Sequence, residues 1–284
     1  MDNFCTGHLS NLVIAMLNPA FTFVEHDVEE PFDGDFDQIY HLASPASPPM
    51  YQKNPITTAK TNFLGTLNAL ELADKLGARF LLASTSETYG DPSVHPQVES
   101  YNGNVNQTGP RACYDEGKRI AETLAFDFQR VRDVDVRVVR IFNTFGPRMN
   151  PADGRVISNF IEQALANREI TIYGEGTQTR SFCYFQDLVD GLELAMNAGD
   201  LDGPVNLGNP EEVTICELAK LIVELSQSKS RLVSRNLPAD DPRQRRPDIG
   251  KAKELLGWQP RVSLRDGLGR TIEYHAEGQA LASC

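Results

Sequence analysis

Short apolar runs alternate with longer segments of helical periodicity along the first half of the chain. The runs 21–25, 36–42, 78–83 and 136–142 predict buried strands, because each is too short to form a helix. Apolar positions spaced three and four apart predict one helix over 56–76, ended by Gly77, and another over 111–131. This alternation is typical of β–α units, so we predict an α/β fold with a doubly wound parallel sheet.

The pattern becomes shorter and more mixed after Gly146. We expect short strands over 171–173, 182–185 and 204–207, and helices over 156–166, 187–198 and 214–225, the last with Thr214 as its N-cap. The stretch 238–247 is polar, proline-rich and basic, and two further helices are expected over 251–256 and 264–282. We therefore predict a sheet domain over 1–150 and a smaller α/β lobe over 151–284, with some chain crossing back to the sheet.

Composition narrows the class of protein. The chain has 284 residues and a net charge of −12, which argues against a general nucleic-acid binder. Its five cysteines are scattered without a Cys-x-x-Cys pair, so neither a metal site nor a disulfide framework is expected. No apolar run is long enough for a membrane segment in this chain. We expect a cytoplasmic protein, or one in the Golgi lumen if the full-length gene carries an anchor.

Tyr114 and Lys118 are the first candidate catalytic pair. They are four residues apart on the predicted helix 111–131 and therefore share one face. A lysine ammonium beside a phenol favours the phenolate and lowers its pKa, so the tyrosine can take a proton near neutral pH. The strand 78–83 leads into Ser84-Thr85-Ser86-Glu87, at the edge where open α/β sheets bind ligands. This pattern indicates alcohol oxidation by a nicotinamide cofactor, although an exposed helical pair would share the spacing.

Several longer motifs resemble the extended short-chain dehydrogenase/reductase superfamily and, within it, the UDP-glucuronate decarboxylases. They are HLASPASPP (41–49), STSETYGDP (84–92), GPRACYDEGKR (109–119) and RIFNTFGPR (140–148). The resemblance continues through NLGNP (206–210) and LLGWQP (255–260), and so covers nearly the whole chain. It implies an NAD-binding Rossmann-like domain over 1–150 and a nucleotide-sugar-binding lobe over 151–284.

The resemblance implies a carboxy-lyase reaction on UDP-glucuronate. Bound NAD takes hydride from C4 of the sugar, which makes a β-keto acid. The C6 carboxylate then leaves as carbon dioxide, because the remaining carbanion is delocalised into the ketone. Return of hydride to C4 gives UDP-xylose, so the cofactor is regenerated and NAD is the only cofactor expected.

The same resemblance implies catalytic roles. Tyr114 would be the base and later the acid at O4, with Lys118 holding the nicotinamide ribose and Thr85 orienting O4. Ser86 and Glu87 would lie beside C5 and C6. Arg245 would face the sugar carboxylate or the reacting carbon, since a planar guanidinium can give two parallel hydrogen bonds.

Binding roles are implied for a larger set of residues. The expected cofactor-binding residues are Asp2, Asn3, Thr6, Gly7, Asp27, Val28, Leu42, Ser44, Tyr114, Lys118, Thr144 and Arg155. The expected substrate-binding residues are Lys60, Asn143, Asn159, Tyr173, Gln178, Arg180 and Arg245. Structural alternatives stay open for some of them: Asn143 as a turn residue, Glu87 as a helix N-terminal charge, Ser44 as a loop former, and Arg245 as part of a solvated basic loop.

Other activities resemble this pattern as well. Nucleotide-sugar 4,6-dehydratases carry Asp-Glu where this chain has Ser86-Glu87, and the aspartate is their expected proton donor. Epimerases lack the carboxylate-facing arginine. A non-catalytic nucleotide-sugar-binding subunit is a third alternative. The decarboxylase interpretation is favoured, with pairing of the helices 56–76 and 111–131 in a four-helix homodimer contact.

The start of the chain departs from the family pattern. No glycine-rich phosphate turn is present, and Asp2 matches a carboxylate that normally follows such a turn by about twenty residues. We expect the first strand, first helix and second strand of the family fold to be missing, and strand 36–42 to be an exposed edge. An incomplete gene model, a truncated isoform and weak NAD binding through the remaining residues are the three explanations. The incomplete gene model is the favoured explanation, and the chain as written is expected to be poorly active or inactive.

Overall fold

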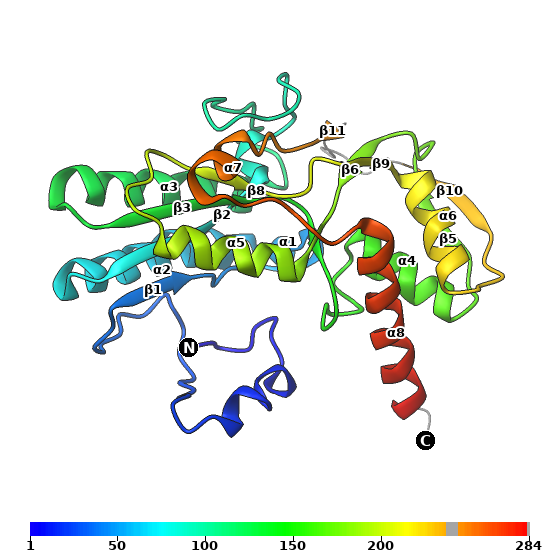
Figure 1. Ribbon diagram of the computed structural model, residues 1–284, viewed down its shortest axis with the longest axis horizontal. Coiled ribbons are helices and arrows are strands. Elements are labelled where there is room, and N and C mark those ends of the chain that lie inside the picture. The colour runs from blue at the N-terminus through cyan, green and yellow to red at the C-terminus, as the bar shows by residue number, and fades with distance from the viewer. Residues whose placement is uncertain (237–243, 283–284) are drawn as a thin grey trace. The chain divides into compact units, whose positions relative to one another are not determined.

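A computed structural model describes residues 1–236 and 244–282 (Figure 1). The chain forms two compact units. Unit 1 contains Met1–Ser84 and Pro110–Val138, and unit 2 contains Thr85–Gly109 and the chain from Val139 onward. The strand β3 (Val136–Ile141) continues from one unit into the other.

Unit 1 holds the parallel strands that the sequence predicts. The strands β1 (Gln38–His41) and β2 (Arg79–Thr85) pair in parallel, with Ile39 beside Phe80. The backbone N–H of Phe80 donates to Asp135 O at 2.9 Å, where β3 begins. The sheet order is β1-β2-β3-β8, so β1 is an edge strand, as the sequence predicts. The predicted α/β class with a Rossmann-like parallel sheet is confirmed.

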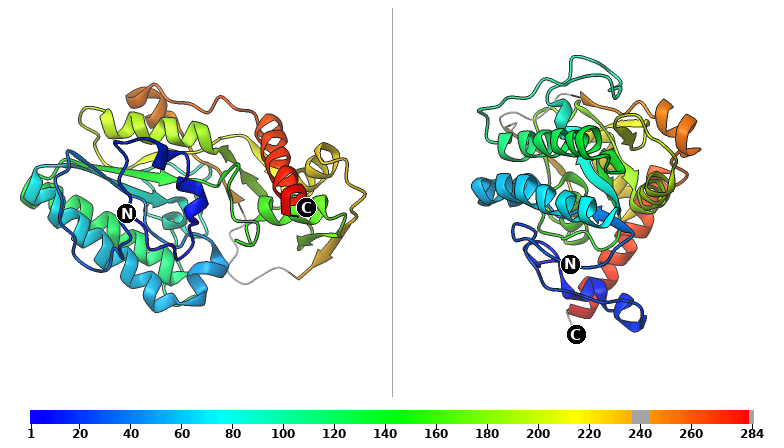
Figure 2. Two further views of the ribbon diagram at one scale, coloured as in Figure 1. Left: turned by 90° about the horizontal axis from the view of Figure 1, so that it is seen from below. Right: turned by 90° about the vertical axis from the view of Figure 1, so that its left-hand side faces the viewer.

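Two long helices cover one face of these strands. They are α2 (Pro55–Leu76) and α3 (Ala112–Arg132), and they lie side by side in both views of Figure 2. Gly77 ends α2 in the left-handed conformation at φ +66°, which glycine adopts without strain. Apolar side chains from both helices pack on β2 and β3; the core includes Leu70, Ala73, Phe80, Leu82, Ala121, Ala125, Val136 and Val138. Both predicted helices are confirmed to within a residue.

The N-terminal segment corrects one prediction. Residues 21–25 do not form a strand; Glu25 makes only an isolated bridge with Asp2. The supporting bonds are Asp2 N–H to Val24 O at 3.2 Å and His26 N–H to Asp2 O at 3.3 Å. An apolar run becomes a strand only where a neighbouring strand supplies hydrogen bonds, and a single residue supplies them here. Two short 3-10 turns, η1 (Leu9–Leu12) and η2 (Ala15–Leu17), precede this run, and the helix α1 (Pro48–Lys53) follows β1.

Unit 2 contains the remaining strands, which are short and form groups of two or three. The second half of β3 pairs in parallel with β8 (Val205–Leu207), with Val139 beside Val205. Outside that pair, β4 (Thr144–Phe145) pairs with β7 (Cys183–Tyr184), and β5 (Ile170–Tyr173) pairs with β10 (Leu232–Arg235). The strand β6 (Thr179–Ser181) lies between β9 (Glu212–Thr214) and β11 (Gln244–Arg245).

Helices complete unit 2. They are α4 (Val156–Leu165), α5 (Phe185–Asn197), α6 (Ile215–Leu225), α7 (Gly250–Leu256) and α8 (Leu264–Ala282), with the 3-10 turn η3 (Ser86–Tyr89) after β2. A core of Phe145, Phe160, Ile161, Ile170, Leu218, Ile222, Leu268 and Ile272 joins α4, α6 and α8. Thr214 caps α6, as predicted, in a capping box with Glu217.

The predicted strand 182–185 is wrong at both ends, since Phe182 and Phe185 are not part of it. Only Cys183 and Tyr184 form β7, and Phe185 is the first residue of α5. The aromatic run is apolar throughout, but Asp187 lies in the first turn of α5, where a carboxylate favours a helix. Most of the predicted basic stretch 238–247 lies outside the described residues. Within the described ranges, no helix is both long and apolar enough to cross a membrane.

Candidate active site

Tyr114 and Lys118 lie on the buried face of α3 in unit 1. Tyr114 is 5% exposed and Lys118 is 2% exposed, so the alternative of an exposed helical pair is wrong. Lys118 Nζ donates to Ala83 O at 2.9 Å, near the carboxyl end of β2. The same nitrogen lies 6.0 Å from the centroid of the Tyr114 ring. The helix thus presents a phenol and an ammonium together beside the end of a parallel strand.

Burial changes the electrostatics of this pair. Desolvation lowers the pKa of Lys118 to about 8, although the nearby carboxylate of Glu122 favours the charged form. Ser84 Oγ donates to the Glu122 carboxylate, which ties α3 to β2 a second time. Burial also lowers the pKa of His41 to about 3, with the charge of Lys118 as the second cause. Lys118 is therefore mostly protonated at neutral pH but loses its proton more readily than an exposed lysine. His41 is neutral at the same pH.

Close packing of α2 on α3 makes this burial possible. A side chain at Gly117 would meet the Asn62 side chain at 3.1 Å, so only glycine fits without a shift of the neighbour. Asn62 is buried and donates to Thr58 O at 2.9 Å within its own helix. Gly117 lies between Tyr114 and Lys118 in the sequence. The close contact of α2 at Gly117 therefore fixes the position of the segment of α3 that carries both residues.

Tyr51 on α1 is a neighbour of Tyr114 that sequence reasoning missed. The two rings stack with centroids 5.0 Å apart and an angle of 2° between their planes. Tyr51 O accepts from Thr58 Oγ1 at 3.0 Å and from Cys113 Sγ at 3.8 Å. No local pattern predicts this contact, because Tyr51 follows a proline-rich loop far from α3 in the chain. An aromatic residue two positions after Pro49 is the only signal that the sequence offers.

In unit 2, Thr85, Ser86 and Glu87 form the sharp turn from β2 into η3. Thr85 and Ser86 are buried and Glu87 is half-buried. Thr85 Oγ1 accepts from the backbone N–H of Glu87 at 3.2 Å, and Thr85 O accepts from Thr88 Oγ1 at 2.9 Å. These bonds end the strand at Thr85 and close the turn that begins η3. The three predicted residues therefore lie together on one hydrogen-bonded turn.

Glu87 and Arg245 form a two-pronged ion pair. Arg245 Nη2 donates to Glu87 Oε2 at 2.9 Å, and Nη1 donates to Oε1. The Arg245 side chain is 4% exposed and the Glu87 side chain 16%. Within the described residues, Nε of Arg245 is buried and has no hydrogen-bond partner. Arg245 is thus not part of a solvated basic loop, and it keeps a buried donor that a ligand can use.

The other predicted residues of unit 2 lie around its short strands. Asn143 lies between β3 and β4 and donates to Ser181 O at 3.4 Å, and Gln178 Nε2 donates to Tyr173 O at 2.8 Å. Arg155 and Asn159 lie at the start of α4, where Arg155 pairs with Asp153 at 3.4 Å. Two predicted residues bond to backbone carbonyls beside them: Thr144 Oγ1 donates to Phe142 O and Arg180 Nη1 donates to Thr179 O.

The predicted residues of the N-terminal part of unit 1 are less enclosed. Asn3 Nδ2 donates to Asp27 Oδ2 at 3.0 Å, and Val28 O accepts from Asn68 at 2.9 Å. Five others lie near these or on the surface: Asp2, Thr6, Leu42 and Lys60 are exposed, and Gly7 is half-buried with Asp2 beside it. Ser44 donates to Pro45 O at 3.2 Å, which fits a loop former. In the part of the chain that the structure describes, no group of three metal-ligating side chains comes together.

Comparison with known proteins is consistent with this geometry. Residues 2–271 match the family described as GDP-mannose 4,6 dehydratase. UDP-glucuronic acid decarboxylase 6 of Arabidopsis thaliana is 57% identical over 267 residues, which are 94% of this chain and 78% of that protein.

Solved structures extend the likeness to the whole fold. The UDP-glucose 4-epimerase of Thermotoga maritima, determined with UDP-glucose, superposes with a TM-score of 0.88 at 31% identity, covering 98% of this chain and 90% of that one. The UDP-glucuronic acid 4-epimerase of Bacillus cereus, in complex with UDP-glucuronic acid and NAD, superposes with a TM-score of 0.85 at 26% identity, covering 95% and 86%. The chain therefore belongs to the GDP-mannose 4,6 dehydratase family and, within it, to the UDP-glucuronic acid decarboxylases.

Proposed function

We propose that this protein is an NAD-dependent UDP-glucuronate carboxy-lyase that forms UDP-xylose through a 4-keto intermediate. The observation that carries the proposal is the buried Tyr114–Lys118 pair, held to β2 by the bond from Lys118 Nζ to Ala83 O at 2.9 Å. The high identity to UDP-glucuronic acid decarboxylases supports the choice of substrate.

Tyr114 is assigned the proton at O4 of the sugar. The cation of Lys118, 6.0 Å from the ring centroid, attracts negative charge on the phenol more strongly than the same cation would in water, because both groups are buried. Tyr114 accepts the proton as O4 becomes a ketone and returns it when the ketone is reduced. It also stabilises charge on O4 while the carboxylate leaves, since that charge is delocalised onto the same oxygen.

The residues present fit the nicotinamide end of NAD. Lys118 is an ammonium with three donors, and in the described ranges its one hydrogen bond is to Ala83 O. The remaining donors suit the ribose hydroxyls of the cofactor, and we propose that Asp2 and Asp27 hold the adenosine end. When bound, NAD supplies a hydride acceptor for C4 and later the hydride donor.

Arg245 and Glu87 are assigned to the carboxylate end of the sugar. The buried Nε donor of Arg245 is directed to the substrate carboxylate or to C5, and the two Nη groups stay on Glu87. Ser86 occupies the position where the related dehydratases place an aspartate. A hydroxyl is a far weaker acid than a carboxyl group, so it does not assist loss of the C6 hydroxyl. This difference favours decarboxylation over dehydration.

The nucleotide is assigned to the short strands of unit 2. Asn143, Asn159, Tyr173, Gln178 and Arg180 offer amides, an aromatic face and a guanidinium, which suit a uracil ring and a diphosphate. An NAD-binding domain over 1–150 and a nucleotide-sugar lobe over 151–284 remain the proposed functional division.

The test is carbon dioxide release from UDP-glucuronate labelled with carbon-14 at C6. The assay uses excess NAD and detects a single turnover. We expect labelled carbon dioxide and UDP-xylose from the parent, and release slower by at least about 100-fold from Tyr114→Phe. Equal rates in the two proteins would refute the proposal. Loss of water from UDP-glucose would favour a dehydratase instead.

We also propose a homodimer through α2 and α3. Ile56 and Phe63 on α2, with Ile120 and Val131 on α3, are exposed apolar residues, which suits a four-helix contact. Light scattering during size-exclusion chromatography tests this. Ile120→Glu is expected to shift the mass from dimer to monomer, and an unchanged mass would contradict the proposed face.

The proposed compartment is the cytoplasm. Among the described residues, the four cysteines Cys5, Cys113, Cys183 and Cys216 are free, which suits a reducing environment. A fluorescent fusion of the full-length gene product tests the location, and fluorescence in the Golgi would contradict it.

A further inference from the structure

The segment that follows Arg245 forms a parallel bridge to Gln97. Within the described residues, β11 pairs with β6 over Gln244 and Arg245, and Pro247 has no backbone N–H to donate. Gln97 pairs with the backbone on both sides of that proline. Its N–H donates to Arg246 O at 2.9 Å, and its carbonyl accepts from the N–H of Asp248 at 2.9 Å.

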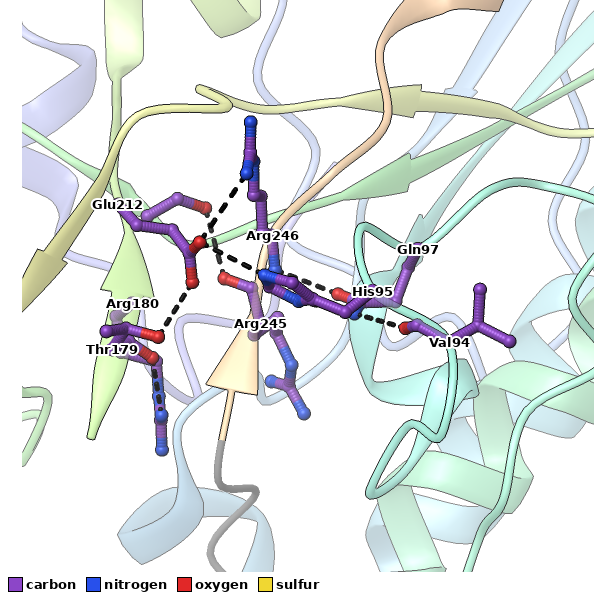
Figure 3. A network of polar contacts seen from close by, with 9 residues as sticks. Val94, His95, Gln97, Thr179, Arg180, Glu212, Arg245 and Arg246 are labelled. Atoms are coloured by element: carbon purple, nitrogen blue, oxygen red, sulfur yellow. Dashed lines mark hydrogen bonds and ion pairs between the residues drawn. The ribbon is translucent and has the colours of Figure 1, made fainter.

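The side chain of Gln97 adds a third bond to the same segment. Gln97 Oε1 accepts from the backbone N–H of Arg246 at 2.8 Å, and Nε2 donates to Val94 O at 2.8 Å (Figure 3). Gln97 is fully buried, at 0% exposure. Both ends of the carboxamide are therefore committed, which fixes the position of Arg246 against the loop that carries Val94.

Fixing Arg246 also sets the direction of Arg245. Neighbouring side chains on an extended backbone point to opposite sides. In Figure 3, the guanidinium of Arg246 points toward Glu212, which lies 3.7 Å away, and that of Arg245 points to the other side of the strand. Glu212 is itself held by Thr179 Oγ1 at 2.7 Å and His95 Nε2 at 3.0 Å. With Arg246 held by Glu212 on one side of the strand, Arg245 extends from the other side to Glu87.

We propose that Gln97 is a positioning residue for the decarboxylation step, acting through Arg246 to hold the Arg245 guanidinium on Glu87. This inference rests on the proposed function, which assigns Arg245 to the sugar carboxylate. A small displacement of a positioned group lowers the rate of the chemical step much more than it lowers substrate affinity, because the reacting atoms lose their alignment. Gln97 itself contacts Arg246, Asp248 and Val94, and it is assigned no contact with the sugar.

The test uses two variants that separate the hydrogen bond from the volume. Gln97→Met keeps the size of the side chain but removes the acceptor for Arg246 N–H. Gln97→Glu keeps that acceptor and loses the Nε2 contacts with Val94 O and His95 Nδ1. Gln186→Met, at an exposed position of α5, is the control for the same chemical change.

For Gln97→Met we expect carbon dioxide release to fall by about 10- to 100-fold, with a small change in KM. The reduced cofactor is then expected to accumulate during turnover, because sugar oxidation does not need Arg245. Gln97→Glu should retain most of the parent rate. The idea is overturned if Gln97→Met releases carbon dioxide at the parent rate, if oxidation falls as much as decarboxylation, or if both variants are equally slow.

Crystal structures of the parent and of Gln97→Met keep this inference separate from the proposed function. We expect the variant to lose the two-pronged contact between Arg245 and Glu87, and an unchanged contact would overturn the positioning role. If the parent itself releases no carbon dioxide, the proposed function fails, and the crystal comparison still decides whether Gln97 positions Arg245.

Discussion

The ring of Tyr51 lies flat against the ring of Tyr114, with centroids 5.0 Å apart and planes within 2° of each other. The backbone of Tyr51 is anchored as well, because its carbonyl accepts from Thr58 Oγ1 on α2 at 3.0 Å. The orientation of the proposed catalytic phenol is thus set by a residue on another helix. Since Tyr51 is 1% exposed, this contact is part of the packing of unit 1.

Replacing Tyr51 with leucine is expected to slow proton transfer at Tyr114. The stack contributes about 0.5–1.5 kcal/mol beyond simple burial, and its loss allows the Tyr114 ring to rotate. We expect kcat to fall by roughly 10-fold and the midpoint temperature of thermal unfolding to fall by a few degrees. Tyr51→Phe keeps the stacked ring and is the matched control. Equal kcat values for the leucine and phenylalanine variants would contradict a role for the stack.

Removing the cation of the Arg245–Glu87 pair is expected to destabilise unit 2. Arg245→Met leaves the largely buried Glu87 carboxylate without its partner, which costs about 3 kcal/mol. Trp258 is the one tryptophan of the chain and is 3% exposed in unit 2, so its fluorescence during urea unfolding reports the change.

The exposed pair Arg265–Glu224 provides the comparison for this measurement. Arg265→Met removes a similar charge from the surface, and no measurable change in stability is expected. Adding Glu87→Gln to Arg245→Met should recover part of the loss, because the unpaired charge is then gone. A loss of stability that is the same with and without Glu87→Gln would argue against coupling of the two residues.

Lys118 is expected to make unit 1 more stable as the pH rises. Its pKa is about 8 in the folded protein and 10.5 in the unfolded chain, so the unfolded chain binds more protons between these values. The free energy of unfolding therefore increases with pH across this window, by up to about 3 kcal/mol. Unfolding followed by circular dichroism, without added nucleotide, measures it as the difference between the parent and Lys118→Met. A difference that is flat from pH 7 to 10 would show that Lys118 is not desolvated.

His41 is expected to make the protein sensitive to acid. Its pKa is about 3 in the folded protein and 6.5 in the unfolded chain, so only the unfolded chain takes up a proton between these values. Stability from this residue is complete above pH 6.5 and falls as the pH drops, with about 3 kcal/mol lost by pH 4.5. His41→Gln should remove this part of the acid sensitivity, whereas replacing the exposed His8 in the same way should not. Identical acid titrations of the parent and His41→Gln would refute the prediction.

The order of the longer elements follows from hydrophobic periodicity, whereas α1 and the short strands β4, β6, β9, β10 and β11 are not predicted. Long helices such as α2 and α3 carry enough apolar positions to define one face, and local chemistry marks their ends at Gly77 and at the cap residue Thr214. Periodicity fails over residues 21–25, because a strand needs a partner that apolar character does not supply. The four-residue spacing of Tyr114 and Lys118 is itself enough to put both side chains on one face of a helix.

Tertiary structure decided the environment of those side chains. Glu87 and Arg245 are 158 positions apart, and Gln97 and Arg246 are 149 apart, so no local pattern relates them. The same holds for the Tyr51 ring and for the desolvation that lowers the pKa of Lys118. Sequence by itself determines which residues share an element, because backbone geometry repeats over a few positions. Packing across the whole chain decides which elements contact one another and how completely water is excluded from those contacts.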